Sequence, residues 1–311
     1  MNYRQLGSSG VRVSEIGLGT NQFGGKVDQA GVNAIIDQAL ESGVNLIDTA
    51  DVYQQGRSEQ ALGEALKGRW GRVILATKGY NQTGAGPNDY GASRYHLVSA
   101  VEASLRRLQA DAIDLYQIHR WDATTPIAET LRALDDLVRS GKVRYVGASN
   151  FAAWQLARAN LLAELRGWAT FVSIQPHYHM LEREVERELL PYCSADGVGL
   201  LPYFPLAGGF LTGKYQRGQP APAGSRGESS AYVQQYMTDA NYTIVERLAA
   251  WAGERGHSLT ELAYAWLLAH PQVSSVIAGV TSADQLRGNA KAAEWQLAPA
   301  ELAEVNGLLG A

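Results

Sequence analysis

The sequence predicts an α/β fold: a (β/α)8 TIM barrel with an N-terminal β-hairpin, as a single domain over residues 1–311. Short apolar runs of strand length alternate with longer segments of helical apolar spacing, and this unit recurs eight times. No change in composition interrupts the alternation. Polar side chains follow most of the apolar runs, as expected where parallel strands open onto a functional face.

The predicted hairpin consists of Tyr3–Gln5 and Val11–Val13, which flank the glycine-containing turn LGSSG. The barrel strands are predicted from eight apolar runs: Ile16–Leu18, Val44–Ile47, Val73–Ala76, Ile113–Ile118, Val143–Ala148, Phe171–Ile174, Val198–Leu201 and Val273–Ala278.

Helices are predicted between these strands from apolar spacing and from glycines that follow several of them. They are Gln29–Ser42, Ser58–Leu66, Tyr95–Leu108, Ile127–Ser140, Trp154–Leu165, Glu182–Ala195, Tyr242–Arg255, Leu259–His270, Ala283–Ala292 and Pro299–Leu309. Pro191 should bend or break the helix that contains it. The stretch Gln216–Ser230, rich in Gly, Pro and Ser, predicts a long mobile loop.

An open, doubly wound sheet is the alternative architecture for alternating strands and helices. That fold carries a phosphate-binding G-x-G-x-x-G after its first strand. The first strand here ends in the pair Gly17-x-Gly19, which is not that motif. The closed barrel is therefore the preferred prediction.

Composition narrows the function classes. The net charge is −4 and the basic residues are scattered, so no nucleic-acid surface is expected. The start MNYRQLGSSG lacks the apolar core of a signal peptide, and no apolar run is long enough to cross a membrane. Cys193 is the only cysteine and excludes an internal disulfide. We expect a cytoplasmic protein with no membrane partner, and nothing in the sequence predicts its oligomeric state.

Polar residues directly follow the predicted strands. They are Asp48, Lys78, His119, Ser149, Asn150, Gln175 and Tyr203. In a barrel the carboxyl ends of all strands open on one face, so these side chains should share one bowl. Each has an ordinary structural explanation when taken alone, such as a helix cap for Asn150. Together they indicate a site.

This set of residues suits the reduction of a carbonyl group. The phenol of Tyr53 can donate a proton, and a nearby ammonium, Lys78, would lower its pKa from about 10. Asp48 would hold that ammonium, and His119 could orient the carbonyl. No side chain supplies hydride, so a cofactor is required. Ser149, Asn150 and Gln175 suit a carboxamide, and Tyr203 offers a flat face for an aromatic ring.

Several segments of the chain resemble signature segments of the aldo-keto reductase family. They are NLIDTADVY, ILATKGY, DLYQIHRWD, VRYVGASNF and LLPYFPLAGGFLTGKY, with YRQLGSSGVRVSEIGLGT near the start and SSVIAGVTSADQLRGN near the end. The resemblance runs from Tyr3 to Asn289. It implies a small-molecule carbonyl substrate and NADPH as cofactor, with NADH as the other candidate.

The resemblance also implies roles for individual residues. The catalytic tetrad would be Asp48, Tyr53, Lys78 and His119, with Tyr53 as general acid in reduction. The cofactor-binding residues would be Gly19, Thr20, Asn21, Ser149, Asn150, Gln175, Tyr203, Leu206, Gly208, Gly209, Lys214, Arg226, Gly279, Thr281, Ser282, Gln285 and Asn289. Strand-end loops carry Phe23, Tyr80, Trp121 and Phe151, which are expected to wall an apolar substrate pocket.

The chain departs from the family pattern at three places. Thr281 and Gln285 are neutral where family members commonly have a base for the 2′-phosphate of NADPH. Phe204 replaces a usual serine. His177 and His179 stand in HYH, where a tyrosine–asparagine pattern is more usual. Alternating histidines are metal-ligand types, but no third ligand is evident at a suitable spacing, so we expect no metal.

Two further functions stay open. Potassium-channel β-subunits resemble this family, so a nicotinamide-binding regulatory subunit is the first alternative. HRWD and the loop Gln216–Ser230 fit that branch, but the chain has no amino-terminal extension to tether a partner. The second is a metal-dependent barrel hydrolase that uses His177 and His179.

Overall fold

The computed structural model describes residues 1–310 and contains eight parallel strands in one sheet. In spatial order they run β10-β3-β4-β5-β6-β7-β8-β9. The bounds are β3 Ile16–Gly19, β4 Leu46–Asp48, β5 Ile74–Gly79, β6 Ile113–Ile118, β7 Val143–Ser149, β8 Phe171–Gln175, β9 Gly199–Leu200 and β10 Val276–Gly279. The predicted (β/α)8 fold is confirmed, with the strands adjacent in the order in which they follow one another along the chain.

The barrel closes between β9 and β10 through isolated bridges. Leu200 pairs with Val273 and Tyr203 with Ile277, both in parallel. The Ser274 N–H donates to the Leu200 carbonyl at 2.9 Å. This contact is sparse because β9 has only two residues, and the chain beyond it turns into an irregular segment.

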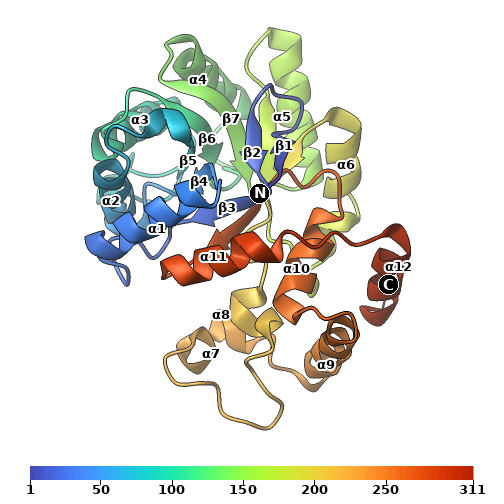
Figure 1. Ribbon diagram of the computed structural model, residues 1–311. Helices are drawn as coiled ribbons and strands as arrows, with labels where there is room; N and C mark the ends of the chain where they lie inside the picture. The colour runs from blue at the N-terminus through green and yellow to red at the C-terminus, as the bar shows by residue number, and fades with distance from the viewer. Residues whose placement is uncertain (311) are drawn as a thin grey trace.

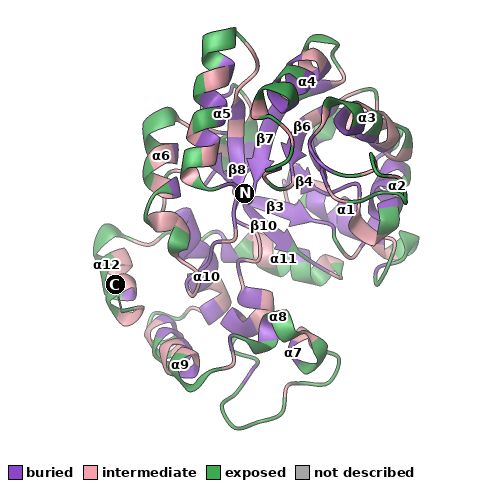
Figure 2. Cartoon of the chain, turned by 180° about the vertical axis from the view of Figure 1, so that it is seen from behind, coloured by how far each residue is buried: buried purple, intermediate pink, exposed green. Residues whose placement is uncertain are grey.

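A ring of helices surrounds the strands (Figure 1). The bounds are α1 Gln29–Glu41, α2 Arg57–Ala65, α3 Arg94–Leu108, α4 Ile127–Arg139, α5 Ala153–Arg166, α6 Leu189–Asp196, α10 Leu259–Leu268 and α11 Ala283–Ala292. Figure 2 shows buried strands inside and exposed outer helix faces, as expected of amphipathic helices packed on a barrel. No helix within residues 1–310 combines the length and apolar character needed to cross a bilayer.

Between β9 and β10 the chain makes a long excursion. It contains the 3₁₀ segment η4 (Ala207–Thr212) and the helices α7 (Arg226–Ser229), α8 (Ala231–Gln234) and α9 (Asp239–Gly253) before α10. In Figure 1, α7, α8 and α9 extend below the barrel. The chain ends with α12 (Pro299–Leu308). Shorter 3₁₀ segments are η1 (Tyr53–Gly56), η2 (Trp70–Arg72) and η3 (Glu184–Glu186).

The hairpin consists of β1 (Tyr3–Gln5) and β2 (Arg12–Ser14), which pair antiparallel. It lies across the barrel axis in Figure 1. Leu6 and Val13 are fully buried and pack against the inward-facing Leu46 and Leu115. The Arg4 guanidinium donates to the carbonyls of Leu268, His270 and Val273 near the end of α10. The hairpin therefore closes the end of the barrel opposite the strand C-termini.

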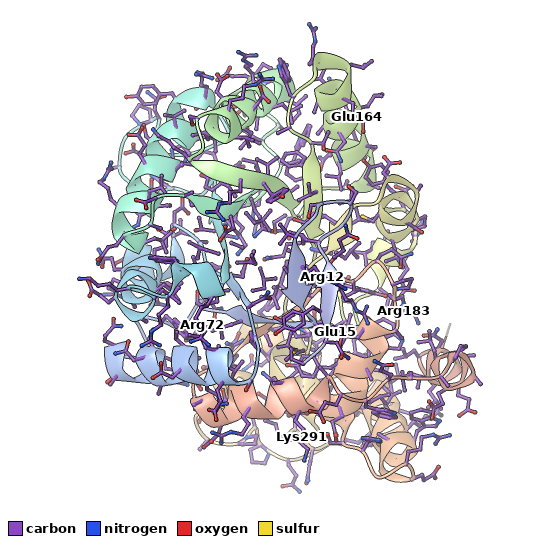
Figure 3. The ribbon with its side chains drawn as sticks, turned by 45° about the horizontal axis from the view of Figure 1, so that its top comes forward. Arg12, Glu15, Arg72, Glu164, Arg183 and Lys291 are labelled. Carbon is purple, nitrogen blue, oxygen red and sulfur yellow. The ribbon has the colours of Figure 1, made fainter. Side chains whose placement is uncertain are left out.

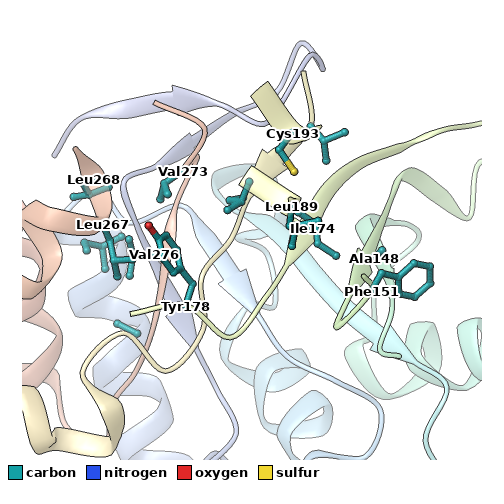
Figure 4. Close-up of a cluster of buried hydrophobic side chains, with 14 of the residues drawn as sticks. Ala148, Phe151, Ile174, Tyr178, Leu189, Cys193, Leu267, Leu268, Val273 and Val276 are labelled. Atoms are coloured by element: carbon teal, nitrogen blue, oxygen red, sulfur yellow. The ribbon is translucent and has the colours of Figure 1, made fainter. Parts of the chain in front are cut away.

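The main core packs the barrel strands against the outer helices. Figure 4 shows part of it, with Ile174 of β8 beside Leu189 and Cys193 of α6 and with Val276 of β10 near Leu267. Cys193 is buried and free, and burial raises the pKa of its thiol to about 12, so it acts as a small apolar residue. Surface side chains such as Glu164 and Arg72 project outward (Figure 3).

Two predicted elements differ in detail. The predicted helix Glu182–Ala195 is divided into η3 and α6, and the break lies at Glu188 rather than at Pro191. Pro191 falls in the first turn of α6, where its missing N–H is not needed. The predicted loop Gln216–Ser230 ends in the short helix α7.

Candidate active site

The site begins with a buried ion pair at the ends of two neighbouring strands. Asp48 ends β4 and Lys78 lies next to the last residue of β5. Lys78 Nζ lies 2.6 Å from Asp48 Oδ2, and the two side chains are 0% and 2% exposed. Lys78 Nζ also donates to the Thr49 carbonyl at 2.9 Å and to Tyr53 Oη at 3.3 Å. Tyr53 reaches the pair from η1, directly after β4.

The charge states of this group follow from burial and proximity. Burial alone would lower the pKa of Lys78, but Asp48 and Tyr53 outweigh it and the pKa is raised, so Lys78 is an ammonium. Burial raises the pKa of Tyr53 above its ordinary value, and Lys78 only partly opposes this shift. Lys78 thus has the predicted lowering effect on the pKa of Tyr53, but burial and the negative charge of Asp48 outweigh it, so the net shift is upward.

His119 directly follows β6 and faces Tyr53, with ring centroids 6.1 Å apart. Burial, Lys78 and Arg120 lower the pKa of His119 to about 3, so the imidazole is neutral at physiological pH. Asn81 Nδ2 lies 2.9 Å from His119 Nδ1. An amide nitrogen only donates, so Nδ1 accepts and the proton is assigned to Nε2 by this hydrogen bond.

Amide side chains fix Asp48 from the other side. Asp48 Oδ1 accepts from Gln175 Nε2 at 2.8 Å and from Gln117 Nε2 at 3.0 Å. Gln117 was not anticipated, although a buried glutamine two residues before His119 in the strand IDLYQI is a signal that could have found it. With Lys78 on its other oxygen, the carboxylate has no freedom to rotate.

Ser149, Asn150 and Tyr203 form a connected polar wall. Ser149 Oγ donates to the Gln175 carbonyl at 2.8 Å, Asn150 Nδ2 donates to Ser149 Oγ at 3.0 Å, and Tyr203 Oη donates to Asn150 Oδ1 at 2.9 Å. Asn150 has φ 55°, a left-handed conformation that Asn tolerates better than most residues. The chain thereby turns its amide back toward His119, whose carbonyl accepts from Asn150 Nδ2 at 3.1 Å.

A cavity of about 1030 Å³ opens above these residues and extends toward α11. Asp48, Tyr53 and His119 line it, while Lys78 lies beneath them. Of the predicted cofactor-binding residues, the structure brings these to its wall: Gly19, Thr20, Asn21, Ser149, Asn150, Gln175, Tyr203, Leu206, Gly208, Gly209, Lys214, Arg226, Gly279, Thr281, Gln285 and Asn289. A cavity of this size is at the upper end of those that bind cofactors and drug-sized ligands.

Five basic residues line the same cavity, and none forms an ion pair within residues 1–310. They are Lys26, Arg120, Lys214, Arg226 and Lys291. Two acidic side chains face them. Asp48 is neutralised by Lys78, and Glu261 accepts hydrogen bonds from Ser258. A cavity with unpaired cations in a chain of net charge −4 favours an anionic ligand. Of these five basic residues, only Lys214 and Arg226 were predicted from the sequence to lie at the cofactor site.

The backbone has a different conformation at the two ends of the cavity, in η4 and at the start of α11. Gly208 and Gly209 in η4 have φ of 68° and 101°, and a Cβ on Gly209 would lie 2.7 Å from Lys214 Nζ. At the other end, Ser282 accepts from the Gln285 N–H as the cap of α11 and does not reach the wall. Gln285 Oε1 accepts from the Thr281 N–H at 2.8 Å.

Comparison with known proteins decides the family. The model of the aldo/keto reductase family matches residues 15–309. The chain is 39% identical over 300 residues to a probable voltage-gated potassium channel subunit beta of Oryza sativa subsp. japonica, covering 94% of this chain and 91% of the relative.

The chain belongs to the aldo/keto reductase family. It is 38% identical over 309 residues to the uncharacterized oxidoreductase YrpG of Bacillus subtilis. The aligned region covers 96% of this chain and 92% of that protein. It is also 34% identical over 328 residues to a versiconal hemiacetal acetate reductase of Aspergillus parasiticus, with 97% and 95% covered. The chain is accordingly an NAD(P)H-dependent aldo-keto reductase.

The four side chains expected to wall a substrate pocket do not line the cavity of this aldo-keto reductase. Phe23 is fully buried in the packing around α1, and Phe151 is buried in the main core (Figure 4). The Tyr80 hydroxyl pairs with Tyr90 at 2.5 Å. Trp121 stacks edge-on against Phe151 and lines a separate hollow of about 410 Å³. Phe23 and Phe151 turn into the packing between strands and helices, and the order of residues in the sequence does not reveal this direction.

His177 and His179 of the aldo-keto reductase form a hydrogen bond with each other. Their Nε2 atoms lie 3.1 Å apart, and the His177 ring stacks on Tyr203 with centroids 5.3 Å apart and planes 9° apart. Burial lowers the pKa of His177 to about 4 and of His179 to about 3, so both are neutral at physiological pH. No group of three or more His, Cys, Asp and Glu residues suited to a metal occurs between residues 1 and 310.

A buried acidic residue behind the site was also missed. Asp51 follows β4, is 3% exposed, and neither carboxyl oxygen has a hydrogen-bond partner in the described part of the chain. Burial, together with the nearby Glu59, raises the pKa of Asp51 from 3.8 to about 7. Glu59 is itself held by Thr77 at 2.6 Å and Arg107 at 2.7 Å. Asp51 lies two residues before Tyr53, in the segment that carries the phenol to the cavity.

Proposed function

We propose that this aldo-keto reductase reduces aldehydes or ketones to alcohols with NADPH, and that Tyr53 is the general acid. The observation that carries the proposal is the contact of Tyr53 Oη with Lys78 Nζ at 3.3 Å, beside a neutral His119. A phenol, an ammonium and an imidazole N–H converge where a carbonyl oxygen would need a proton.

Each residue has a distinct role in the proposed reaction. Tyr53 gives its proton to the carbonyl oxygen as that oxygen gains charge, and Lys78 stabilises the phenolate that is left. Asp48 keeps Lys78 charged and fixed in place. His119 donates from Nε2 to the carbonyl oxygen and so orients it. The nicotinamide, when bound, supplies hydride to the carbonyl carbon.

The remaining cavity residues are proposed to hold the cofactor. Ser149, Asn150 and Gln175 would contact the nicotinamide carboxamide, and Tyr203 would lie against its ring. The glycines of η4 let backbone approach the pyrophosphate, with Lys214 and Arg226 as counter-ions. Gly279, Thr281, Gln285 and Asn289 would take the adenosine end, near Lys291 of α11 (Figure 3). The chain acts in this proposal as one domain in the cytoplasm.

NADPH is expected to bind at least tenfold more tightly than NADH. The extra 2′-phosphate carries negative charge to the adenosine end of the cavity, where Lys291 of α11 forms no ion pair within residues 1–310, and a charge-assisted hydrogen bond contributes about 1.5–3 kcal/mol. Tryptophan fluorescence titrated with each dinucleotide measures the two dissociation constants. The preference should narrow as salt concentration rises. Equal affinity for the two cofactors would contradict the NADPH assignment.

Turnover tests the reaction class directly. Aromatic, aliphatic and sugar aldehydes are mixed with enzyme and NADPH, and loss of the reduced cofactor is followed together with formation of the alcohol. At least one class should be reduced catalytically. Failure to turn over any carbonyl while NADPH binds would remove the proposed reaction and leave only a cofactor-binding protein.

A regulatory role is the second candidate, because two relatives are named probable voltage-gated potassium channel subunit beta. In this proposal the chain would bind a membrane partner and respond to the redox state of its cofactor. Pull-down from solubilised membranes and size-exclusion chromatography test it. Fast carbonyl turnover by a species that captures no membrane partner would exclude this role.

A further inference from the structure

Arg120 is the basic residue of the cavity that directly follows a proposed catalytic residue, His119. It leaves the end of β6, is exposed, and lines the cavity wall. Among residues 1–310 its guanidinium forms neither an ion pair nor a hydrogen bond. Arg106 and Arg139, which lie on outer helices, do not line the cavity. An arginine that lines a ligand cavity without a protein partner has donors free for a ligand.

The charge of Arg120 acts on the groups around the catalytic end. Burial is the main cause of the lowered pKa of His119, and Arg120 adds to it. Burial raises the pKa of Tyr203 and of Tyr232, and Arg120 opposes both shifts. The guanidinium is therefore near enough to His119, Tyr203 and Tyr232 for their charges to interact. His119, Tyr203 and Tyr232 come from three separate segments of the chain, and all three line the same cavity as Arg120.

Tyr232 of α8 supplies a hydroxyl on the same wall. It is 45% exposed and packs on Phe204, with ring centroids 4.8 Å apart. Its Oη lies 3.3 Å from both ring nitrogens of His177, so it bonds to the edge of that ring. His179 accepts from the Leu181 N–H through Nδ1, so its proton is on Nε2 and is donated to His177 Nε2. His177 Nδ1 then carries the proton that meets Tyr232.

This hydrogen-bond chain orients the hydroxyl of Tyr232 at the cavity wall. Tyr232 accepts from His177 and also hydrogen-bonds with Tyr203, so a ligand would share or replace the Tyr203 contact. Arg120 after β6 and Tyr232 of α8 thus present a guanidinium and a phenol hydroxyl on the wall of one cavity, together with Phe204 and Tyr203. A planar guanidinium and a hydroxyl that line the same cavity match a carboxylate, which accepts up to two such donors on each oxygen.

We propose that Arg120 and Tyr232 form an anion subsite and that this reductase acts preferentially on carbonyl compounds that carry a carboxylate. The inference rests on the proposed carbonyl reduction and names its substrate class. The reducible carbonyl lies at Tyr53 and His119, and the carboxylate lies at the mouth. His177 and His179 act as positioning residues for Tyr232 and do not touch the substrate.

The test compares two aldehydes of nearly the same shape: 4-carboxybenzaldehyde and its neutral methyl ester. The measured quantity is the ratio of kcat/KM for the acid to kcat/KM for the ester, in wild type and in Arg120→Gln. The ratio should fall by about ten- to a hundredfold in Arg120→Gln, since one charge-assisted contact is lost. Tyr232→Phe should lower the ratio by about three- to tenfold. The loss should appear mainly in KM.

Lys26→Gln is the matched control, because it removes one unpaired positive charge from the same cavity. Its ratio should stay within about threefold of wild type. NADPH affinity is measured for every variant and reports both folding and cofactor contacts. The inference is overturned if the ratio is unchanged in Arg120→Gln, if Lys26→Gln lowers it equally, or if Arg120→Gln weakens NADPH binding by the same factor. A wild type that reduces neither of these aldehydes but does reduce neutral carbonyl compounds overturns the carboxylate preference alone. A wild type that binds NADPH and reduces no carbonyl compound at all refutes the proposed reaction itself.

Discussion

Replacing Tyr53 with Phe should lower kcat for carbonyl reduction by about 10²–10⁴-fold, the usual contribution of a positioned general acid. The change removes one oxygen and keeps the ring, so the cavity shape is retained. The Lys78–Asp48 pair stays intact, because Asp48 still holds the ammonium at 2.6 Å. NADPH affinity should change by less than about threefold. Single-turnover reduction of an aromatic aldehyde under saturating cofactor measures the effect on the chemical step.

Tyr3→Phe provides the control for this variant. Tyr3 lies in the hairpin at the opposite end of the barrel, and its hydroxyl donates to the Gly43 carbonyl at 2.8 Å. Removing that hydroxyl alters a surface hydrogen bond and leaves kcat as in wild type. Turnover of Tyr53→Phe within about tenfold of wild type would show that another group donates the proton.

The pH profile adds an independent check. Because burial raises the pKa of Tyr53, the phenol keeps its proton through neutral pH and beyond. Reduction should therefore show no loss of kcat on the alkaline side until pH exceeds the ordinary phenol range of about 10. A decline centred between pH 7 and 8 would mean that a different group controls the protonated state.

Asp51→Asn is expected to raise the free energy of unfolding at pH 8, by up to about 4 kcal/mol. The buried carboxyl has a pKa of about 7 in the fold against 3.8 ordinarily. Each pKa step corresponds to about 1.4 kcal/mol. Below about pH 4 the Asp51 carboxyl holds its proton in both the folded and the unfolded state, so its ionisation does not lower the free energy of unfolding. As pH rises from 4 to 7 the unfolded state loses its proton first, and stability falls.

Above pH 7 the folded state must carry a buried charge, and the penalty is complete. Asparagine cannot ionise, so the stability difference between Asp51→Asn and wild type should grow from pH 4 to pH 8. Chemical denaturation at both pH values measures it. Asp111→Asn, at an exposed position, should show no such growth. A difference independent of pH would mean that Asp51 is already ionised at pH 4 at no cost to folding.

Much of the architecture could be predicted because it depends on local patterns. Apolar runs such as Ile113–Ile118 mark strands, and β6 has those same bounds. Barrel geometry then brings strand-end residues together, so Asp48 and Lys78 could be predicted as neighbours although 30 residues separate them. Resemblance to the family added the remaining cofactor residues, nearly all of which line the cavity.

Other features depend on three-dimensional detail that no local pattern contains. The direction of a ring after a strand is set by its neighbours, so Phe23 turns into the core instead of toward the cavity. The sign of the pKa shift at Tyr53 depends on the balance of burial against Lys78. Arg120 looks like any surface arginine in the sequence, and only its place on the wall without a partner makes it notable.

The excursion between β9 and β10 has a consequence for how this enzyme can be altered. Residues 206–236 supply Gly209, Lys214 and Arg226 on the proposed dinucleotide side and Tyr232 on the proposed substrate side. Exchanging this one stretch with that of a relative would therefore be expected to change cofactor binding and substrate choice together. Single substitutions, such as at Tyr232 within the stretch or at Arg120 outside it, would separate the two properties.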